Sequence, residues 1–404
     1  MSGGWSLRRV LTVCSSLAIT ILLFFSYKNA QIALPQHTSS AAAFSDKQLR
    51  HDLLDDISNA TLGFQKIFII NLASRTDRRD AAALAAALTG LEVEFVEAAT
   101  HVDAKAAPPG AKEINLNPGG VGAWRSHLNV VERIVHQNIS SALVLEDDAD
   151  WDIRIKSQMR DFARASRLLI QPLAGTTNKF LDPTWPQPNE EHQVSTDFDI
   201  GAAVTGQPST SPYGDLDRWD MLWLGHCGCR FPWAADKNVP LGRAIIPNDT
   251  TVPERKQINI EFGDSQLLDE YPDYTRVVAR SRVNTCTLGY GLSQAGARRL
   301  LYEIGIHKVS GPIDMMYRSA CDGVDGRALM TCLSPQPALF NHHRPVAPRW
   351  TFSDISGSEN PSDPGDQGWN DVPASVNIRW ATRVNFDQLL KGATDYIDNY
   401  KEIK

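Results

Sequence analysis

Residues 141–150 read Ser-Ala-Leu-Val-Leu-Glu-Asp-Asp-Ala-Asp, an apolar run that ends in four carboxylates within five positions. The apolar run predicts a buried strand, and open α/β sheets bind their ligands at the carboxyl ends of such strands. Carboxylates this close repel one another unless a positive charge lies among them, and a hard divalent cation meets that need. The alternative is a solvated acidic turn after a buried strand.

Strands and helices alternate on both sides of this stretch. Strands are predicted at 66–72, 92–98, 219–225 and 284–292, and helices at 74–88 (capped by Ser74), 122–137, 151–170, 293–301 (capped by Ser293) and 386–403. This alternation is typical of an α/β fold with a parallel sheet. Residues 171–217 are rich in Pro, Gly and Thr and too long for an ordinary connection, so they predict a surface insertion or lid.

The amino terminus predicts a membrane anchor. Arg8 and Arg9 precede residues 10–27, which contain no charge and are barely long enough to cross a bilayer as a helix. We favour an uncleaved signal anchor over a cleaved signal peptide, with the arginines in the cytosol. The predicted order is a cytosolic tail (1–9), a transmembrane anchor (10–27), a stem (28–63) and a luminal domain (64–404), as in a single-pass type II protein of the Golgi or ER membrane.

Composition excludes one class of partner. The net charge is −7 and the isoelectric point is near 5.8, with no basic stripe, which argues against nucleic-acid binding. A length of 404 residues with 42% hydrophobic content is enough for a large core in one or two domains.

Sequons and cysteines agree with a luminal location. Glycosylation acceptor triplets begin at Asn59, Asn138 and Asn248. Five cysteines follow the apolar span, which permits two disulfides and one free thiol; they are Cys227, Cys229, Cys286, Cys321 and Cys332. The proximity of Cys321 and Cys332 makes them the first pair to expect. His226 to Cys229 could suggest zinc, but no second ligand pair stands at the usual spacing.

Two groups of residues could bind a nucleotide diphosphate. Asn71, Arg75 and Arg78 surround a predicted helix start, where helix amino termini and arginines favour phosphate oxygens. The alternative is a helix with solvated arginines, and the absence of glycines excludes a P-loop. In the second group, Glu146 or Asp148 could hold a metal ion that neutralises a leaving diphosphate.

The neighbouring acids have separate expectations. Asp147 could accept a hydrogen bond from a ribose hydroxyl, and Asp150 is a spare ligand or a helix cap. Asp314, after the rigid turn Gly311–Pro312, could serve as a general base; its alternative role is a helix N-cap.

Histidines supply further candidates. His342 and His343 are adjacent, so they point in different directions; one could complete a metal site and the other is expected at the surface. Ser126 and His127 flank the apolar stripe of a predicted helix, and a core role is the default for His127.

Taken in their order along the chain, these motifs resemble those of glycosyltransferase family 25, which includes lipopolysaccharide galactosyltransferases and procollagen galactosyltransferases. The matching residues are 69–72 with Arg75, Asp77 and Arg78, Gly122 with 126–128, 142–148, 220–225, 289–297 and 312–314. The resemblance spans residues 66–340. Residues 171–217 have no counterpart in the family pattern, and Gly291–Leu292 depart from it.

The resemblance implies a GT-A-like (Rossmann-like) nucleotide-sugar transferase fold that uses a UDP-sugar donor and Mn²⁺. It carries the acidic triplet over to Glu146, Asp147 and Asp148, the nucleotide turn to Asn71, Arg75 and Arg78, and the late aspartate to Asp314. We therefore expect an inverting transfer of a hexose to a hydroxyl of a glycan or glycoprotein acceptor, with galactose as the first candidate for the hexose.

Two alternatives remain at the level of sequence. One is a carbohydrate-binding membrane protein of the same fold without catalysis, against which the intact acidic triplet argues. The other is a metal-dependent hydrolase of sugar nucleotides, which would use an ordered water in place of an acceptor.

Overall fold

The computed structural model describes residues 52–400, except 112–113, 115, 261 and 356–367. The predicted cytosolic tail, the anchor at 10–27 and residues 28–51 of the predicted stem lie outside the described residues. Among the residues that are described, no helix combines the length and the apolar character needed to cross a membrane.

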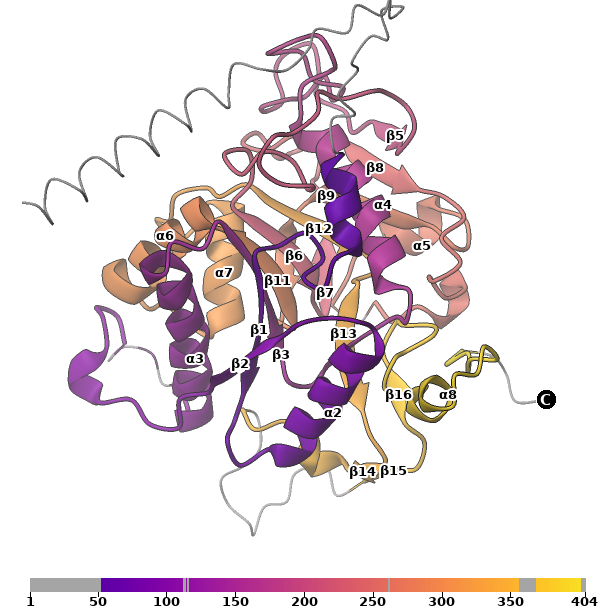
Figure 1. The fold of residues 1–404 in the computed structure, drawn as a ribbon. Coiled ribbons are helices and arrows are strands. Elements are labelled where there is room, and N and C mark those ends of the chain that lie inside the picture. The colour runs from indigo at the N-terminus through magenta and orange to yellow at the C-terminus, as the bar shows by residue number, and fades with distance from the viewer. Residues whose placement is uncertain (1–51, 112–113, 115, 261, 356–367, 401–404) are drawn as a thin grey trace, which may run out of the picture. The chain divides into compact units, whose positions relative to one another are not determined.

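A mixed sheet of twelve strands forms the centre of the domain (Figure 1). Its strands are β1 (Lys66–Asn71), β2 (Glu94–Glu97), β3 (Ser141–Glu146), β4 (Ala149–Trp151), β5 (Asp197–Asp199), β6 (Met221–Gly225), β8 (Arg243–Ile246), β9 (Arg276–Arg280), β11 (Gly289–Ser293), β12 (Cys332–Gln336), β13 (Phe340–Arg344) and β16 (Ala374–Ser375). Two-stranded sheets pair β7 (Gly228–Arg230) with β10 (Arg282–Thr285) and β14 (Ala347–Pro348) with β15 (Trp369–Asn370).

The sheet is parallel where the alternation of strands and helices predicted it and mixed beyond that part. Strands β2, β1 and β3 are parallel neighbours, as the alternation of strands and helices indicated. Strand β11 then runs antiparallel between β3 and β6. The α/β class is confirmed, but the direction of β11 depends on a long connection whose path leaves no local signal in the sequence.

Helices cover both faces of the sheet (Figure 1). They are α2 (Thr76–Leu88), α3 (Pro118–His136), α4 (Ile155–Ile170), α5 (Gln266–Glu270), α6 (Gln294–Tyr302), α7 (Ile313–Asp322) and α8 (Phe386–Leu390). Shorter helical turns are η1 (Leu53–Ser58), η2 (Ala104–Ala106), η3 (Arg255–Gln257), η4 (Glu303–His307) and η5 (Arg349–Phe352).

Alternation along the strands explains the two cores. Ile69 and Leu145 pack with α2 and α4, whereas Phe68 and Val144 pack with α3, α6 and α7. Successive side chains of a strand point to opposite faces, and both faces are covered, so the strands appear in the sequence as continuous apolar runs. This packing holds the carboxyl ends of β1 and β3 side by side.

Several predicted boundaries move. Residues 52–63, assigned to the stem, belong to the domain, because η1 packs against α4 and Ile57 and Leu62 are fully buried. Helix α4 begins at Ile155 and not at 151, since Trp151 is taken into β4 by pairing with β13. The carboxy-terminal helix is only α8, which ends near the left-handed Gly392.

The predicted helix caps differ in outcome. Ser293 caps α6 through its hydroxyl, which accepts from the Gly296 amide. Ser74 does not cap α2, because Arg75 occupies that position without a side-chain cap bond. Residues 171–217 carry only the short strand β5 and are otherwise irregular, in agreement with a predicted insertion.

The described cysteines form two disulfides and leave one free thiol, as predicted. Cys321 is bonded to Cys332 and Cys227 to Cys286. Among the described cysteines, Cys229 is the free one, and it is buried. No zinc site forms at His226 to Cys229, because the Cys227 sulfur is consumed by the bond to Cys286.

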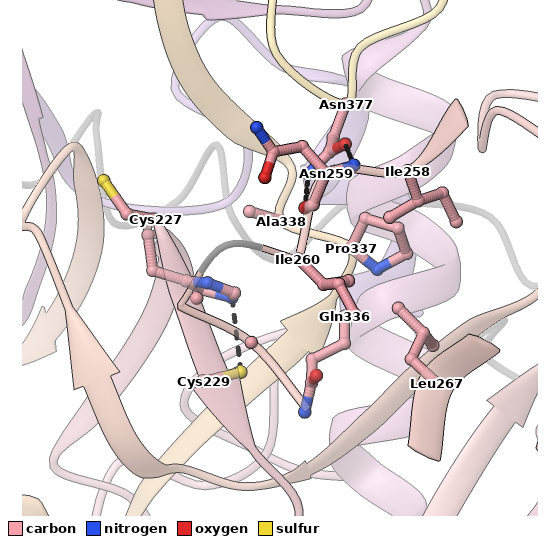
Figure 2. A pocket seen from close by; sticks show the side chains of 13 residues that line it. Cys227, Cys229, Ile258, Asn259, Ile260, Leu267, Gln336, Pro337, Ala338 and Asn377 are labelled. Carbon is pink, nitrogen blue, oxygen red and sulfur yellow. Dashed lines mark hydrogen bonds between the residues drawn. The ribbon is translucent and has the colours of Figure 1, made fainter. Parts of the chain in front are cut away.

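His226 is a buried neutral histidine beside this bond. Its Nε2 donates to the carbonyl oxygen of Pro335 at 2.8 Å, and its Nδ1 has no hydrogen-bond partner. With Cys229 it lines a cavity of about 20 Å³ (Figure 2), which is room for about one water. Burial lowers the pKa of His226 to about 4.

Acidification from pH 6.5 to 4 is expected to destabilise the domain by about 3 kcal/mol through His226 alone. The unfolded chain binds more protons than the folded protein in this window, so stability is complete above pH 6.5 and falls as the pH approaches 4. His226→Gln, which retains a donor for Pro335, should flatten this slope. Urea unfolding at pH 6.5 and 4.5 measures it, and an identical slope in the variant contradicts the assignment.

Candidate functional site

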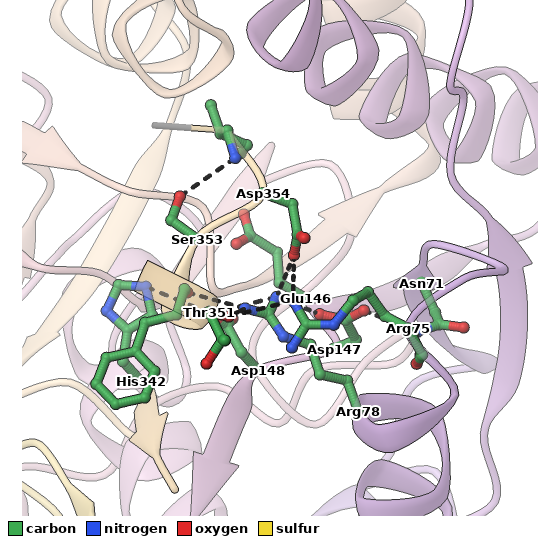
Figure 3. Close-up of polar contacts among 12 residues, drawn as sticks. Asn71, Arg75, Arg78, Glu146, Asp147, Asp148, His342, Thr351, Ser353 and Asp354 are labelled. Carbon is green, nitrogen blue, oxygen red and sulfur yellow. Dashed lines mark hydrogen bonds and ion pairs between the residues drawn. The ribbon is translucent and has the colours of Figure 1, made fainter. Parts of the chain in front are cut away.

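The acidic stretch lies at the carboxyl end of β3, beside the carboxyl end of β1 (Figures 1 and 3). Strand β3 ends at Glu146, Asp147 and Asp148 form a turn, and β4 leads back to pair antiparallel with β13. The three acids therefore lie where β1, β3 and β13 meet. The turn is what separates their side chains into different environments.

Asp147 is held by residues that follow β1. Asn71 Nδ2 donates to its Oδ2 at 2.8 Å, and an Arg78 guanidinium nitrogen donates to its Oδ1 at 3.0 Å. Burial raises the pKa of Asp147, and the neighbouring Arg78 opposes that effect. The predicted grouping of Asn71 and Arg78 with the acidic turn is therefore present in the structure.

Asp148 is the most positively surrounded acid of the turn. Its Oδ2 lies 3.8 Å from Arg78, 3.8 Å from Arg344 and 3.9 Å from His342 Nε2. Burial would raise its pKa, but His342, Arg78 and Arg344 together hold the pKa of Asp148 below its usual value. Its Oδ1 is buried and has no hydrogen-bond partner. The turn thus presents an ionised carboxylate with one buried oxygen that has no hydrogen-bond partner.

Glu146 faces the opposite side of the turn. Its Oε1 accepts from the Thr287 hydroxyl at 2.6 Å and lies 3.3 Å from His127 Nε2. His127 is buried, as predicted, and its Nδ1 is 2.8 Å from the Tyr290 hydroxyl. Glu146 is therefore already engaged by two side chains, which makes it a less available metal ligand than Asp148.

Ser126 is structural. Its hydroxyl donates to Gly122 O at 2.7 Å and accepts from the Ala99 amide at 2.8 Å. It ties α3 to the segment after β2.

A late segment lies across the arginines of the site (Figure 3). The Asp354 carboxylate is 2.5 Å from Arg75 and 3.4 Å from Arg78. Arg78 also donates to the carbonyl of Phe352 at 2.8 Å, and Ile355 O accepts from Asn117. The two arginines predicted to bind phosphate thus lie together, and a carboxylate of the chain itself is bound to them.

The two adjacent histidines point in different directions, as predicted, but neither is at the surface. His342 faces Asp148, whereas His343 Nδ1 lies 3.0 Å from the Ser375 hydroxyl and close to Asp150. Burial lowers the pKa of His342 and lowers that of His343 to about 3. Both histidines are therefore neutral near pH 7, and only His342 belongs to the site.

Asp150 is neither a spare ligand nor a helix cap. It is fully buried and accepts from the Ser375 hydroxyl at 2.6 Å and from the Arg383 amide. It joins β4 to the carboxy-terminal segment, and Arg383 in turn donates to Asp147 O. A charge bound so completely is structural, because its loss leaves buried groups without partners.

Asp314 lies in the first turn of α7, whose N-cap is Pro312. Its Oδ2 accepts from the Cys286 amide at 3.0 Å, and its Oδ1 accepts from the Met315 amide at 2.9 Å. The next residue after Cys286 is Thr287, which binds Glu146. Asp314 and the acidic turn therefore border the same loop, residues 286–288.

Several residues of the site had no signal in the sequence. Arg344, Arg383, Thr287 and Asp354 lie far along the chain from the acidic turn and belong to no spaced motif. Within the described residues, no three His, Cys, Asp or Glu side chains are gathered closely enough to hold a metal ion by themselves. All three sequon asparagines are exposed.

Comparison with known proteins agrees with this arrangement. Residues 64–182, which contain β1, α2, α3, β3 and the acidic turn, match the model of glycosyltransferase family 25, described as an LPS biosynthesis protein. This segment is similar to glycosyltransferase family 25. The resemblance noted in the sequence is thereby confirmed for these residues.

Curated relatives match over a similar length. Procollagen galactosyltransferase 2 of mouse and of human are each 31% identical over 114 residues, 24% of this chain and 18% of the relative. A glycosyltransferase 25 family member of Anopheles gambiae is 34% identical over 126 residues, 27% of this chain and 21% of the relative. The match thus spans about a fifth of the length of these curated relatives.

Proposed function

We propose that this protein is a glycosyltransferase that moves a hexose from a UDP-sugar to a hydroxyl of a glycan or glycoprotein, with galactose as the first candidate for the hexose. The observation that carries the proposal is the acidic turn itself. Asp148 Oδ1 has no hydrogen-bond partner, its Oδ2 lies 3.8 Å from Arg78, and Arg75 and Arg78 together bind the Asp354 carboxylate, which makes them an anion-binding edge. An anionic ligand that brings its own cation, such as a nucleoside diphosphate, fits both halves of this site.

The donor diphosphate is assigned to Arg75 and Arg78. Both guanidinium groups already bind a carboxylate, Asp354, and arginine pairs with phosphate oxygens in the same geometry. Asn71 and Asp147 lie beside them, and we assign the ribose hydroxyls to Asp147. When the bond between the sugar and UDP breaks, the arginines stabilise the negative charge that develops on UDP.

The side chains of the acidic turn fit Mn²⁺ only if the diphosphate and water supply the remaining ligands. Asp148 Oδ1 is free, and His342 is neutral and 3.9 Å from the same carboxylate. Divalent ions of this kind are often held by one or two protein ligands, with phosphate oxygens and water supplying the rest. Asp148 and His342 would hold the ion, with Glu146 the less available candidate. A bound ion would add Lewis-acid stabilisation of the diphosphate.

Asp314 is assigned as the general base. It takes the proton of the acceptor hydroxyl as that oxygen forms a bond to the anomeric carbon of the donor. The bond from this carbon to the UDP oxygen breaks on the opposite side, and UDP leaves with the electron pair. The product configuration is then inverted. Most of residues 171–217 lies outside the segment that matches the family model. We place the residues that select the acceptor in this insertion.

Turnover of UDP-sugars tests the proposal. UDP release is measured with UDP-galactose, UDP-glucose and UDP-N-acetylglucosamine in Mn²⁺, with and without a panel of glycan and collagen-peptide acceptors. Acceptor-dependent release supports a transferase, whereas fast release without any acceptor supports a hydrolase. No release from any donor, with UDP binding unchanged by Asp148→Ala, would contradict the proposal.

Asp354→Asn is expected to tighten UDP binding about threefold, because one partly exposed carboxylate stops competing for Arg75 and Arg78 and such pairs are worth up to about 1 kcal/mol. Calorimetric titration with UDP measures the effect. Asp387→Asn, which removes the exposed pair with Lys391, is the matched control. Weaker binding in Asp354→Asn would show that Asp354 supports the site.

We further propose a single-pass type II location in the Golgi or ER membrane, with the domain in the lumen. Two disulfides and three exposed sequons support a luminal domain. Asn248→Gln is expected to increase the electrophoretic mobility of the secretory-pathway protein by one glycan. The difference should vanish after glycosidase treatment, and equal mobility before treatment counts against glycosylation at Asn248.

A further inference from the structure

The loop that carries Cys286 connects the proposed base to the acidic turn. It joins β10 to β11, where the sequence predicted one continuous strand. Cys286 interrupts that strand with a left-handed backbone, φ +63°, which a residue with a Cβ rarely adopts. Such a conformation persists only when the surroundings determine it. Contacts on every side of Cys286 do so.

Each polar group of Cys286 has a fixed partner. Its amide donates to Asp314 Oδ2 at 3.0 Å, its carbonyl accepts from Trp223 Nε1 at 2.9 Å, and its sulfur is bonded to Cys227. The amide of Cys227 donates to Thr285 O at 3.0 Å. The bond therefore joins the β6–β7 loop to the β10–β11 loop next to Asp314.

The same bond reaches the other side of the site. The Cys227 sulfur lies 3.9 Å from Nδ1 of His342, whose Nε2 faces Asp148. The residue after Cys286, Thr287, donates to Glu146. One covalent bridge thus contacts, directly or through one residue, the proposed base, the late histidine and the first acid of the turn.

We propose that the Cys227–Cys286 disulfide is a positioning element for catalysis, which fixes the Cys286 amide so that it orients the Asp314 carboxylate toward the acceptor. The inference rests on the proposed function. It assigns to this bridge a role that Cys321–Cys332 does not have, because that bridge joins α7 to β12 within the packed core behind the site.

The role predicts a specific kinetic pattern. With the bridge removed, Asp314 keeps its charge and its helix but loses the fixed direction of one hydrogen bond. A misdirected base slows the chemical step, and small misplacements of reacting groups cost up to about 100-fold. Donor binding at Arg75 and Arg78 involves neither cysteine. At saturating Mn²⁺, where the contact of Cys227 with His342 does not limit binding of the ion, we therefore expect kcat to fall about 10- to 100-fold while the KM for the donor stays constant.

The test compares two disulfide deletions in the full chain. Cys227→Ala with Cys286→Ala removes the bridge and leaves Cys229 without a nearby partner for mispairing; Cys321→Ala with Cys332→Ala is the matched control. Circular dichroism and thermal unfolding establish that both variants are folded at the assay temperature. UDP affinity, donor KM and kcat for transfer from UDP-galactose are then measured.

A double-mutant cycle separates positioning from general stability. In an Asp314→Asn background, removal of Cys227–Cys286 should not lower the residual kcat further, because the bridge acts through Asp314. Equal losses for both disulfide deletions, or a full further loss in the Asp314→Asn background, would overturn the inference and leave the transferase intact. If the unaltered protein turns over no donor, the proposed function fails and this inference fails with it.

Discussion

Replacing Asp148 with asparagine is expected to reduce kcat/KM for sugar transfer about 1,000-fold, equivalent to about 4 kcal/mol of transition-state stabilisation. Asparagine has nearly the same shape but carries no charge, while Arg78 and Arg344 remain close by. The variant therefore loses the anion that would bind the ion accompanying the diphosphate. Initial rates at varied Mn²⁺ and UDP-galactose measure the loss, and weaker dependence on Mn²⁺ should accompany it.

The adjacent histidines supply the control for this experiment. His342→Asn should lower apparent Mn²⁺ affinity, because His342 faces Asp148. His343→Asn should leave it unchanged, because His343 faces Ser375 and Asp150. Asp150 is unsuitable as a control despite its proximity, since it is fully buried and bound to Ser375 and the Arg383 amide. Equal effects of the two histidine variants would contradict the assignment of Asp148 and His342.

Asp314→Asn is expected to lower kcat about 100- to 10,000-fold, the range that general bases contribute, while UDP affinity stays within twofold. Asparagine keeps one acceptor oxygen, so it can accept from the amide of Cys286 or from that of Met315, but one of these two bonds of Asp314 is lost. What disappears is the ability to take the acceptor proton. Single-turnover transfer assays measure the chemical step, and calorimetry with UDP measures binding.

A different outcome would reassign the base. If Asp314→Asn retains most of its kcat, another group must accept the proton. Glu146 is the next candidate, because Thr287 of the same 286–288 loop donates a hydrogen bond to it. Glu146→Gln would then show the large loss. An increase in KM for the acceptor without a change in kcat would place Asp314 in acceptor binding and not in chemistry.

The sequence predicted the part of the site that local patterns specify. Continuous apolar runs identified β1 and β3, because both faces of these strands are covered. The placement of Asn71, Arg78 and the acidic turn together followed from the rule that carboxyl ends of neighbouring parallel strands meet at one edge. The number of disulfides and the first pair, Cys321–Cys332, followed from counting and proximity.

Local patterns could not distinguish the roles of the four acids. Asp148 and Asp150 are both acids after the same strand, yet one keeps a free oxygen and the other is bound to Ser375, more than two hundred residues later. The difference arises from the pairing of β4 with β13. That pairing joins distant parts of the chain and depends on how the whole sheet packs.

By itself, then, the sequence determined the α/β class, the resemblance of residues 64–182 to glycosyltransferase family 25 and the acidic turn, because strand burial, helix periodicity and charge clustering act within a few neighbouring residues. Only the tertiary structure decided the mixed strand order, the approach of Arg344 and Asp354 to the turn, and the bridge from Cys227 to Cys286 beside Asp314. These contacts join residues far apart in the chain, and the free energy that selects them comes from packing the complete core.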